Sequence, residues 1–268
     1  MHFYIFALIV VSLALTLSHS LDISETERTL AEIYELSIQL AKETSPEKIH
    51  KRLFAISSSN HLLHRKSIDS KDTVLMVTLT PFFSHYKQNT PITLQRYIWV
   101  TASPELHMFC NQYVAQQNKI DEPALITRLQ QKLGLPFKAG EHKIVELWVQ
   151  PEDLFRPCAD SEITDNECQL DFPEHAPEEH RRWLAEKVAS SFHPHEAVRY
   201  SFTSLGYTYD WCPDAVTSVG LSEYVIKMGS EVFVGNIHSP MEYCSQPSPH
   251  MSCKDTSVDI CVQKNEPQ

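Results

Sequence analysis

The amino-acid sequence predicts an α+β fold, with an N-terminal helical hairpin, a mixed sheet with helices, and a β-rich C-terminal half that disulfides support. Three observations lead to this prediction. Helical spacing of apolar residues comes first along the chain, mixed strand and helix patterns follow, and alternating strand patterns dominate after residue 197. No internal repeat is visible. Segregated helices and strands, without a regular strand-helix alternation, are typical of the α+β class.

Apolar residues recur at helical spacing near the N-terminus. They predict an amphipathic helix over residues 24–43, where Ser24 and Glu27 have the spacing of a capping box. Proline is common at the first position of a helix, so Pro46 predicts the start of a second one. Its apolar face would contain Ile49, Leu53 and Ile56.

The remaining elements are predicted from β-branched runs, alternation and helix-start signals. Strands are expected at 73–80, 92–100, 142–149, 198–202, 222–228 and 231–237, and helices at 103–117, 121–134 and 177–190. The predicted organisation is a signal peptide (1–20), an N-terminal helical region (21–72), a main α+β domain (73–240) and a cysteine-containing tail (241–268).

The first residues predict export. An apolar run of 15 residues extends from Phe3 to Leu17, and small residues follow at Ser18 and Ser20. This pattern is typical of a secretory signal cleaved after Ser20. The alternative is an uncleaved anchor, but the run is shorter than the ~20 residues that span a bilayer. We therefore expect a secreted protein, periplasmic or extracellular, with no membrane span after cleavage.

The charge limits the classes of partner. The chain of 268 residues has a formal net charge of −11, which argues against nucleic acid because phosphate recognition needs clustered Lys and Arg. It contains six glycines, no GxGxxG and no GxxxxGK[ST] motif, so a Rossmann site and a P-loop are not expected. An unknown protein or a small molecule remains as the expected partner.

Seven cysteines in an exported chain indicate disulfides, with at least one cysteine left over. Cys158 and Cys168 are ten residues apart, separated by turn-forming residues, and are expected to pair. Cys110 is the expected unpaired cysteine, because the apolar pattern around it predicts a buried thiol. No CxxC or HExxH motif occurs, and no ligand set for zinc can be named.

The segment 220–234 (GLSEYVIKMGSEVFV) is the most informative for chemistry. It resembles the signature of ADP-ribosyltransferase-type toxins and related NAD-cleaving domains, in which a catalytic Glu begins a strand that turns at Gly-Ser. The resemblance implies NAD as substrate and Glu223 as the catalytic residue. A carboxylate there would stabilise an oxocarbenium-like ribose. The second carboxylate of the family pattern is replaced by Leu221, which favours NAD cleavage over arginine modification.

The same resemblance implies further site residues. Thr203 and Ser204 correspond to part of the family's Ser-Thr-Ser strand, and Arg96 to its first-strand arginine. Independently, aromatic residues alternate along 200–211, which would place their rings on one strand face. From that face Tyr207, Tyr209 and Trp211 would stack a ring of the ligand, although core packing explains the same pattern.

An acidic block between Trp148 and Pro173 supports a second function. Hard oxygen ligands in a stapled loop suit calcium, although no EF-hand frame fits and a solvated acidic loop explains the same residues. Its acidic residues are Asp153, Asp160, Glu162, Asp165, Glu167 and Asp171. The two functional hypotheses are therefore an NAD-using glycohydrolase or ADP-ribosyltransferase-like enzyme, and a non-catalytic binding protein with an acidic, calcium-binding loop.

Overall fold

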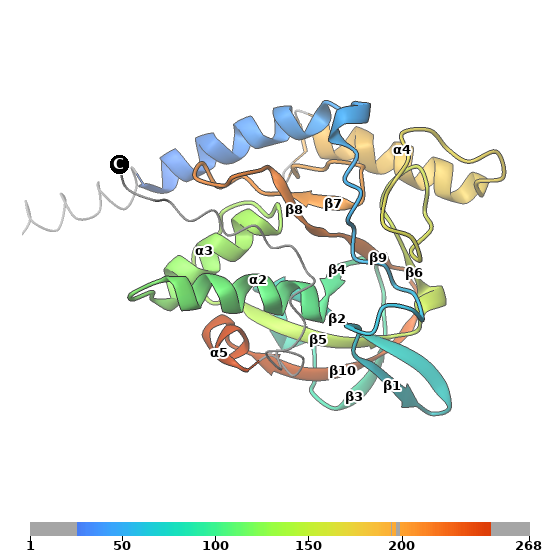
Figure 1. The fold of residues 1–268 in the computed structure, drawn as a ribbon, viewed down its shortest axis with the longest axis horizontal. Coiled ribbons are helices and arrows are strands. Elements are labelled where there is room, and N and C mark those ends of the chain that lie inside the picture. The colour runs from blue at the N-terminus through green and yellow to red at the C-terminus, as the bar shows by residue number, and fades with distance from the viewer. Residues whose placement is uncertain (1–25, 194, 197–198, 248–268) are drawn as a thin grey trace, which may run out of the picture.

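The computed structural model describes residues 26–193, 195–196 and 199–247, and it confirms the α+β class (Figure 1). Eight strands form one sheet whose pairings are all antiparallel, in the order β3-β10-β5-β2-β4-β9-β6, with β1 paired to β2. A second, two-stranded sheet consists of β7 and β8. Short β8 leads almost directly into β9, so the small sheet is covalently continuous with the large one.

The strands have the following bounds. They are β1 Arg65–Ile68, β2 Lys71–Thr80, β3 Thr90–Thr93, β4 Ile98–Ala102, β5 Lys143–Val149, β6 Leu154–Phe155, β7 Tyr207–Tyr209, β8 Val219–Ser222, β9 Tyr224–Ile226 and β10 Glu231–His238.

The helices begin with an N-terminal helix that covers residues 26–42 of the described chain. The others are α2 Ser103–Gln116, α3 Glu122–Lys132, α4 Glu178–Phe192 and α5 Pro240–Ser245, with short 3₁₀ turns η1 Pro46–Lys48, η2 Phe83–His85 and η3 Pro151–Asp153. None of the helices in the described part of the chain is long and apolar enough to cross a bilayer.

The two faces of the large sheet bury different cores, because neighbouring residues of a strand point to opposite faces. On β2, Val74 and Met76 belong to a core that the irregular segment after η1 helps to cover. Val77 and Leu79 face the opposite way, onto α2, α3 and α5. The small sheet packs against α3 on one side, while the N-terminal helix runs alongside it (Figure 1).

Most regular elements lie where the sequence predicts them, but the prediction of a second helix that begins at Pro46 is wrong. Only η1 forms, and the chain then continues without regular structure. Its backbone is bonded to distant segments instead: the amide of Leu53 donates to Asn166, that of Ile56 to Ile163 and that of Phe54 to the Ser222 hydroxyl. The apolar residues are buried as predicted, yet the hydrogen bonds come from tertiary neighbours.

Two predicted strands also differ. The run 92–100 divides into β3 and β4, because Leu94 exchanges hydrogen bonds with the β9–β10 turn. That turn is Gly229-Ser230 as predicted, with Gly229 at φ +88°. The run 198–202 forms no strand among its described residues, and only an isolated bridge joins Phe202 to Thr208. Helix α5 was not expected in the cysteine-containing tail.

The cysteines pair in two ways within the described chain. Cys158 and Cys168 are bonded, as predicted. Cys110 is not the unpaired cysteine: it is bonded to Cys244 across 134 residues and joins α2 to α5. Its burial in an apolar cluster was predicted, but α5 brings a second sulfur into that cluster. Cys212 is the free cysteine of the described residues.

Candidate functional site

Strand pairing places Glu223 on the side of the sheet that faces α4. Glu223 immediately precedes β9 and is two residues from Val225, so their side chains share a face. Val225 pairs with Trp99 of β4 on one side and with Phe155 of β6 on the other. Opposed residues of an antiparallel pair also share a face. Glu223 therefore lies at the edge of an aromatic surface.

This surface is a tryptophan cluster, formed by Trp99, Phe155, Trp183 and Phe202. The rings of Trp99 and Trp183 are 6.1 Å apart, and Phe202 meets Trp99 edge-on at 5.6 Å. Phe155 packs edge-on to Trp183 at 4.7 Å. Both tryptophans keep part of their surface in solvent. Partly exposed indole rings offer a stacking surface to a planar ligand.

Lys187 of α4 connects the cluster to Glu223. Its Nζ lies 5.4 Å from the centre of the Trp99 ring, and its positive charge acts on the Glu223 carboxyl. It stands one helical turn after Trp183, so both side chains lie on the same face of α4. A cation, a carboxyl group and two indole rings thus converge from α4, β4 and the β8–β9 junction.

The environment of Glu223 shifts its protonation. The residue is only partly buried by exposed area, yet enough protein surrounds the carboxyl that desolvation raises its pKa to about 8. The charge of Lys187 opposes that rise. Desolvation also lowers the pKa of Lys187, against the opposing effects of Glu223 and Glu196. Perturbed pairs of this kind are frequent at functional sites.

The carboxyl of Glu223 differs from that of Glu105 in its hydrogen bonds. Its backbone amide donates to Gly206, at 2.9 Å, but no hydrogen bond joins its carboxyl to another described residue. Glu105 of α2, by contrast, accepts hydrogen bonds from the amide and hydroxyl of Ser222 at 3.0 Å each. The carboxyl of Glu223 therefore lacks the hydrogen-bond donors that hold the carboxyl of Glu105 in place.

Thr203 and Ser204 support the backbone next to Glu223. The buried Thr203 hydroxyl donates to the carbonyl of Tyr207, at 2.6 Å, and accepts from the amide of Leu205. Ser204 has φ +49° and donates to the Thr203 carbonyl. Together they form the turn that brings the Gly206 carbonyl to the Glu223 amide. Their hydroxyls form hydrogen bonds within this turn.

Arg96 lies away from this group. It is an exposed residue of the segment between β3 and β4. On β4, Val100 pairs with Tyr224 at the start of β9, whereas Ile98 pairs with Ile226 at its end. Arg96 thus lies beyond the end of β9 opposite to Glu223, and the fold does not bring the two together.

The predicted aromatic face is divided among separate cores. Tyr207 packs with Leu53 and the Cys158–Cys168 bridge, whereas Trp211 packs with Tyr34 and Ile38 of the N-terminal helix. Phe202 joins the tryptophan cluster instead. The alternation is broken because Ser204 and Gly206 both have positive φ, which turns the chain between the two halves. Tyr207, Tyr209 and Trp211 therefore do not form one stacking surface.

The acidic block is organised around an arginine. The guanidinium of Arg156 is fully buried and forms an ion pair with Asp165. It also donates to the carbonyl of Glu167, at 3.1 Å. Within the described ranges, no three His, Cys, Asp or Glu side chains are grouped so that they could hold a metal ion. In this loop a side-chain cation balances part of the negative charge.

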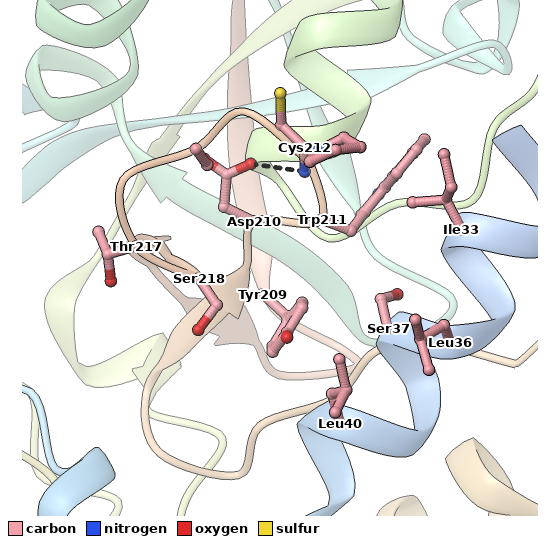
Figure 2. A pocket seen from close by; sticks show the side chains of 12 residues that line it. Ile33, Leu36, Ser37, Leu40, Tyr209, Asp210, Trp211, Cys212, Thr217 and Ser218 are labelled. Carbon is pink, nitrogen blue, oxygen red and sulfur yellow. Dashed lines mark hydrogen bonds between the residues drawn. The ribbon is translucent and has the colours of Figure 1, made fainter.

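A groove of about 310 Å³ lies elsewhere, between the N-terminal helix and the chain that follows β7 (Figure 2). The helix contributes Ile33, Leu36 and Leu40, and the opposite wall contains Tyr209, Trp211 and Cys212. Asp210 also lines it, but Arg128 holds that carboxylate with two hydrogen bonds, at 2.8 and 2.9 Å. The groove thus presents mainly apolar side chains.

The sequence prediction named Glu223 as a candidate but did not place Lys187, Trp99 and Trp183 near it. Two local signals were available. Trp183 and Lys187 are four residues apart on a predicted helix, and Trp99 alternates with Tyr97 along a predicted strand. Neither signal shows that the helix packs beside the strand, because residue 99 is far from residue 187 in the sequence.

Comparison with known proteins gives no relative for this arrangement. No family model matches the chain, and no curated protein or solved structure matches it. The function must therefore be argued from the residues themselves.

Proposed function

We propose that the protein is an NAD-using glycohydrolase, with Glu223 as its catalytic residue and Trp99 as the surface that stacks the nicotinamide or adenine ring. The observation that carries the proposal is the convergence of the Glu223 carboxyl, Lys187 and the half-buried tryptophans at the edge of one sheet. The resemblance of residues 220–234 to NAD-cleaving domains supports the same assignment.

The chemistry needs the ionised form of Glu223. The bond between ribose C1′ and the nicotinamide nitrogen breaks, and its electron pair stays on the ring, which leaves as neutral nicotinamide. Water then adds its oxygen to C1′ and releases a proton. A carboxylate beside the ribose stabilises the positive charge that develops between these steps. The positive nicotinamide ring of bound NAD would also favour ionisation of Glu223.

The roles of other residues follow from their contacts. Lys187 lies near enough to Glu223 to lower its pKa, and it is suited to meet a phosphate of the dinucleotide. Thr203 and Ser204 hold the turn that fixes the Glu223 backbone. They are positioning residues, since their hydroxyls are already bonded within the protein.

The direct test is release of nicotinamide from NAD by the purified protein, followed by chromatography. Glu223→Gln keeps the size of the side chain and removes its charge, so we expect kcat to fall about 10²–10³-fold. Glu231→Gln is the matched control, because Glu231 is an exposed residue across the same turn. Its activity should equal that of the wild type.

The pH profile gives a second readout. Because burial raises the pKa of Glu223 to about 8, kcat/KM should rise with pH through the range below that value. Lys187→Met should move the rise to higher pH. Wild-type protein that releases no nicotinamide would overturn the proposal, and a non-catalytic binding protein would then be the better account.

A further inference from the structure

We propose that the Cys158–Cys168 disulfide is a redox-sensitive link between the two parts of the candidate site, the turn before Glu223 and helix α4. The oxidised link holds Lys187 of α4 near Glu223, and reduction of the link lets the two side chains separate. The consequence for catalysis rests on the proposed function, whereas the positioning of Lys187 against Glu223 does not.

The disulfide packs directly against the turn that precedes Glu223. Cys158 forms an isolated antiparallel bridge with Leu205. A Cβ atom added to Gly206 would lie 2.5 Å from the sulfur of Cys168, so the sulfur lies against the backbone of this residue. The carbonyl of Gly206 accepts a hydrogen bond from the amide of Glu223, at 2.9 Å. The disulfide therefore supports the residue that holds the Glu223 backbone.

The same disulfide is joined to α4 through a histidine. The Nε2 atom of His180 lies 2.7 Å from the carbonyl oxygen of Cys158, to which it donates because a carbonyl can only accept. The His180 ring lies nearly parallel to that of Trp183, with the ring centres 6.0 Å apart. Lys187 follows Trp183 by one helical turn, on the same face of α4. The hydrogen bond from His180 thus ties this face to the disulfide.

Apolar contacts alone do not fix α4 in this position. Ala159, next to Cys158, belongs to the same buried cluster as Leu184 of α4 and Phe202. Such contacts keep the helix on the sheet, but they are not directional. A hydrogen bond has a preferred distance and angle, and a disulfide has a specific geometry. We therefore expect α4 to remain packed after reduction, with Lys187 no longer held near Glu223.

The two disulfides of the described chain differ in what must open before a reductant reaches them. All four cysteines are at most 1% exposed. Cys110 and Cys244 lie in helices α2 and α5. Cys158 and Cys168 lie in the described segment 156–177, yellow in Figure 1, which has no helix or strand and only the isolated bridge at Cys158. Irregular surface segments open at lower cost than packed helices, so this disulfide should be reduced first.

The reduction is a thiol–disulfide exchange with a dithiol, such as the reduced form of an oxidoreductase. One thiolate of the dithiol attacks a sulfur of the bridge, the sulfur–sulfur bond breaks, and the other cysteine leaves as a thiolate that takes up a proton. The second thiolate of the dithiol then attacks the mixed disulfide. Cys158 and Cys168 together gain two electrons and two protons, and the dithiol is released as a disulfide.

The electrostatic coupling between Lys187 and Glu223 tests the positioning without any substrate. In the otherwise wild-type protein, Lys187→Met should raise the pKa of Glu223, because the charge of the lysine lowers it. NMR titration of the Glu223 carboxyl measures this rise. In a chain that carries Cys158→Ala and Cys168→Ala, Lys187→Met should leave the pKa of Glu223 unchanged, since the two side chains are no longer held together.

The other disulfide supplies the matched control. A chain with Cys110→Ala and Cys244→Ala loses a link across 134 residues, which should cost more stability than a link across ten. It should nevertheless keep the full effect of Lys187→Met on the pKa of Glu223. Equal coupling in the two disulfide-free chains, whether full or lost, would overturn the proposal.

A milder variant tests the connection through α4 with the disulfide intact. His180→Phe keeps a ring that can stack on Trp183 but removes the hydrogen bond to Cys158. Lys187→Met should then raise the pKa of Glu223 by less than it does in the presence of His180. His175→Phe, at an exposed position before α4, should leave the rise unchanged. A full rise in the His180→Phe chain would contradict the proposed link.

Brief treatment with dithiothreitol, after existing free thiols are blocked, tests the redox sensitivity. Alkylation and mass spectrometry should find Cys158 and Cys168 modified before Cys110 and Cys244, and the reverse order would refute it. Nicotinamide release should fall about 10²-fold at the same stage and return on reoxidation. Activity that persists after reduction would also overturn the proposal. A wild-type protein without activity would refute the proposed function instead, and the coupling and alkylation results would still decide this inference.

Discussion

Two carboxyl groups lie near the β8–β9 junction and are held in different ways. Glu105 reaches Ser222 and accepts hydrogen bonds from its amide and hydroxyl, with a further one from Thr101 at 3.4 Å. Glu223 has only the charge of Lys187 to offset its burial. Burial raises the pKa of both groups. The first holds α2 against β8, whereas the carboxyl of the second accepts no hydrogen bond from the described residues.

The comparison of Glu105 with Glu223 shows that a raised pKa does not depend on whether the protein holds the carboxyl by hydrogen bonds. A raised pKa is common to both sites, so it does not by itself identify the reactive one. The supply of hydrogen-bond donors distinguishes the two groups: a carboxylate whose acceptor sites are filled by the protein stabilises the fold, and a buried one without donors lowers its stability. The following predictions test whether the two groups differ in this way.

The largest effect on stability is expected at Glu105. Glu105→Ala leaves the Ser222 amide and hydroxyl without their buried acceptor, so the free energy of unfolding should fall by about 3 kcal/mol. Urea denaturation should show a lower midpoint with an unchanged slope. Glu231→Ala is the control and should change little. A loss below ~1 kcal/mol at Glu105 would remove the distinction between the sites.

The next largest effect is that the stability contributed by Glu223 depends on pH. The unfolded carboxyl ionises near ~4.3 and the folded one at about 8, so between these values the folded chain binds more protons. Stability from this group is therefore lost as pH rises. Glu223→Gln should make the protein more stable relative to wild type at pH 8 than at pH 6, by about 2 kcal/mol. Denaturation at both pH values measures it, and identical differences would contradict it.

A smaller effect is expected in the turn that supports Glu223. Thr203→Val removes a buried hydroxyl bonded to Tyr207 and Leu205, and it should cost about 1.5 kcal/mol of unfolding free energy. Ser204→Ala removes a single bond from a half-buried hydroxyl to the adjacent carbonyl and should cost less. Paired thermal denaturation curves compare the two. Equal losses would mean that the turn does not depend on Thr203.

The smallest effect on stability is expected at Lys187. Lys187→Met gives up a cation–π contact of ~0.5–1 kcal/mol with Trp99 but avoids the desolvation of an ammonium group. Stability at pH 7 should change by less than about 1 kcal/mol, while the pKa of Glu223 should rise. NMR titration of the Glu223 carboxyl measures the rise. Lys71→Met, in an exposed pair with Glu231, should leave it unchanged.

The sequence alone was sufficient for the elements that form from local patterns. The β-branched run of β2 and the alternating run of β5 became strands, and helices α2 and α3 begin at the predicted proline signals. The Cys158–Cys168 bridge followed from a ten-residue spacing. In each case the information lies within about fifteen residues, which is the range over which periodicity and turn chemistry act.

Only the tertiary structure decided the features that join distant segments. The residues after η1 stay irregular because their amides find acceptors more than a hundred residues away. Cys110 pairs with Cys244 because α5 packs on α2, and Lys187 comes near Glu223 because Trp183 of α4 packs on Trp99 of β4 and Phe155 of β6. Such contacts depend on which faces of the helices and strands pack together. The sequence shows which residues share one face of a helix or strand, but it does not show which other element packs on that face.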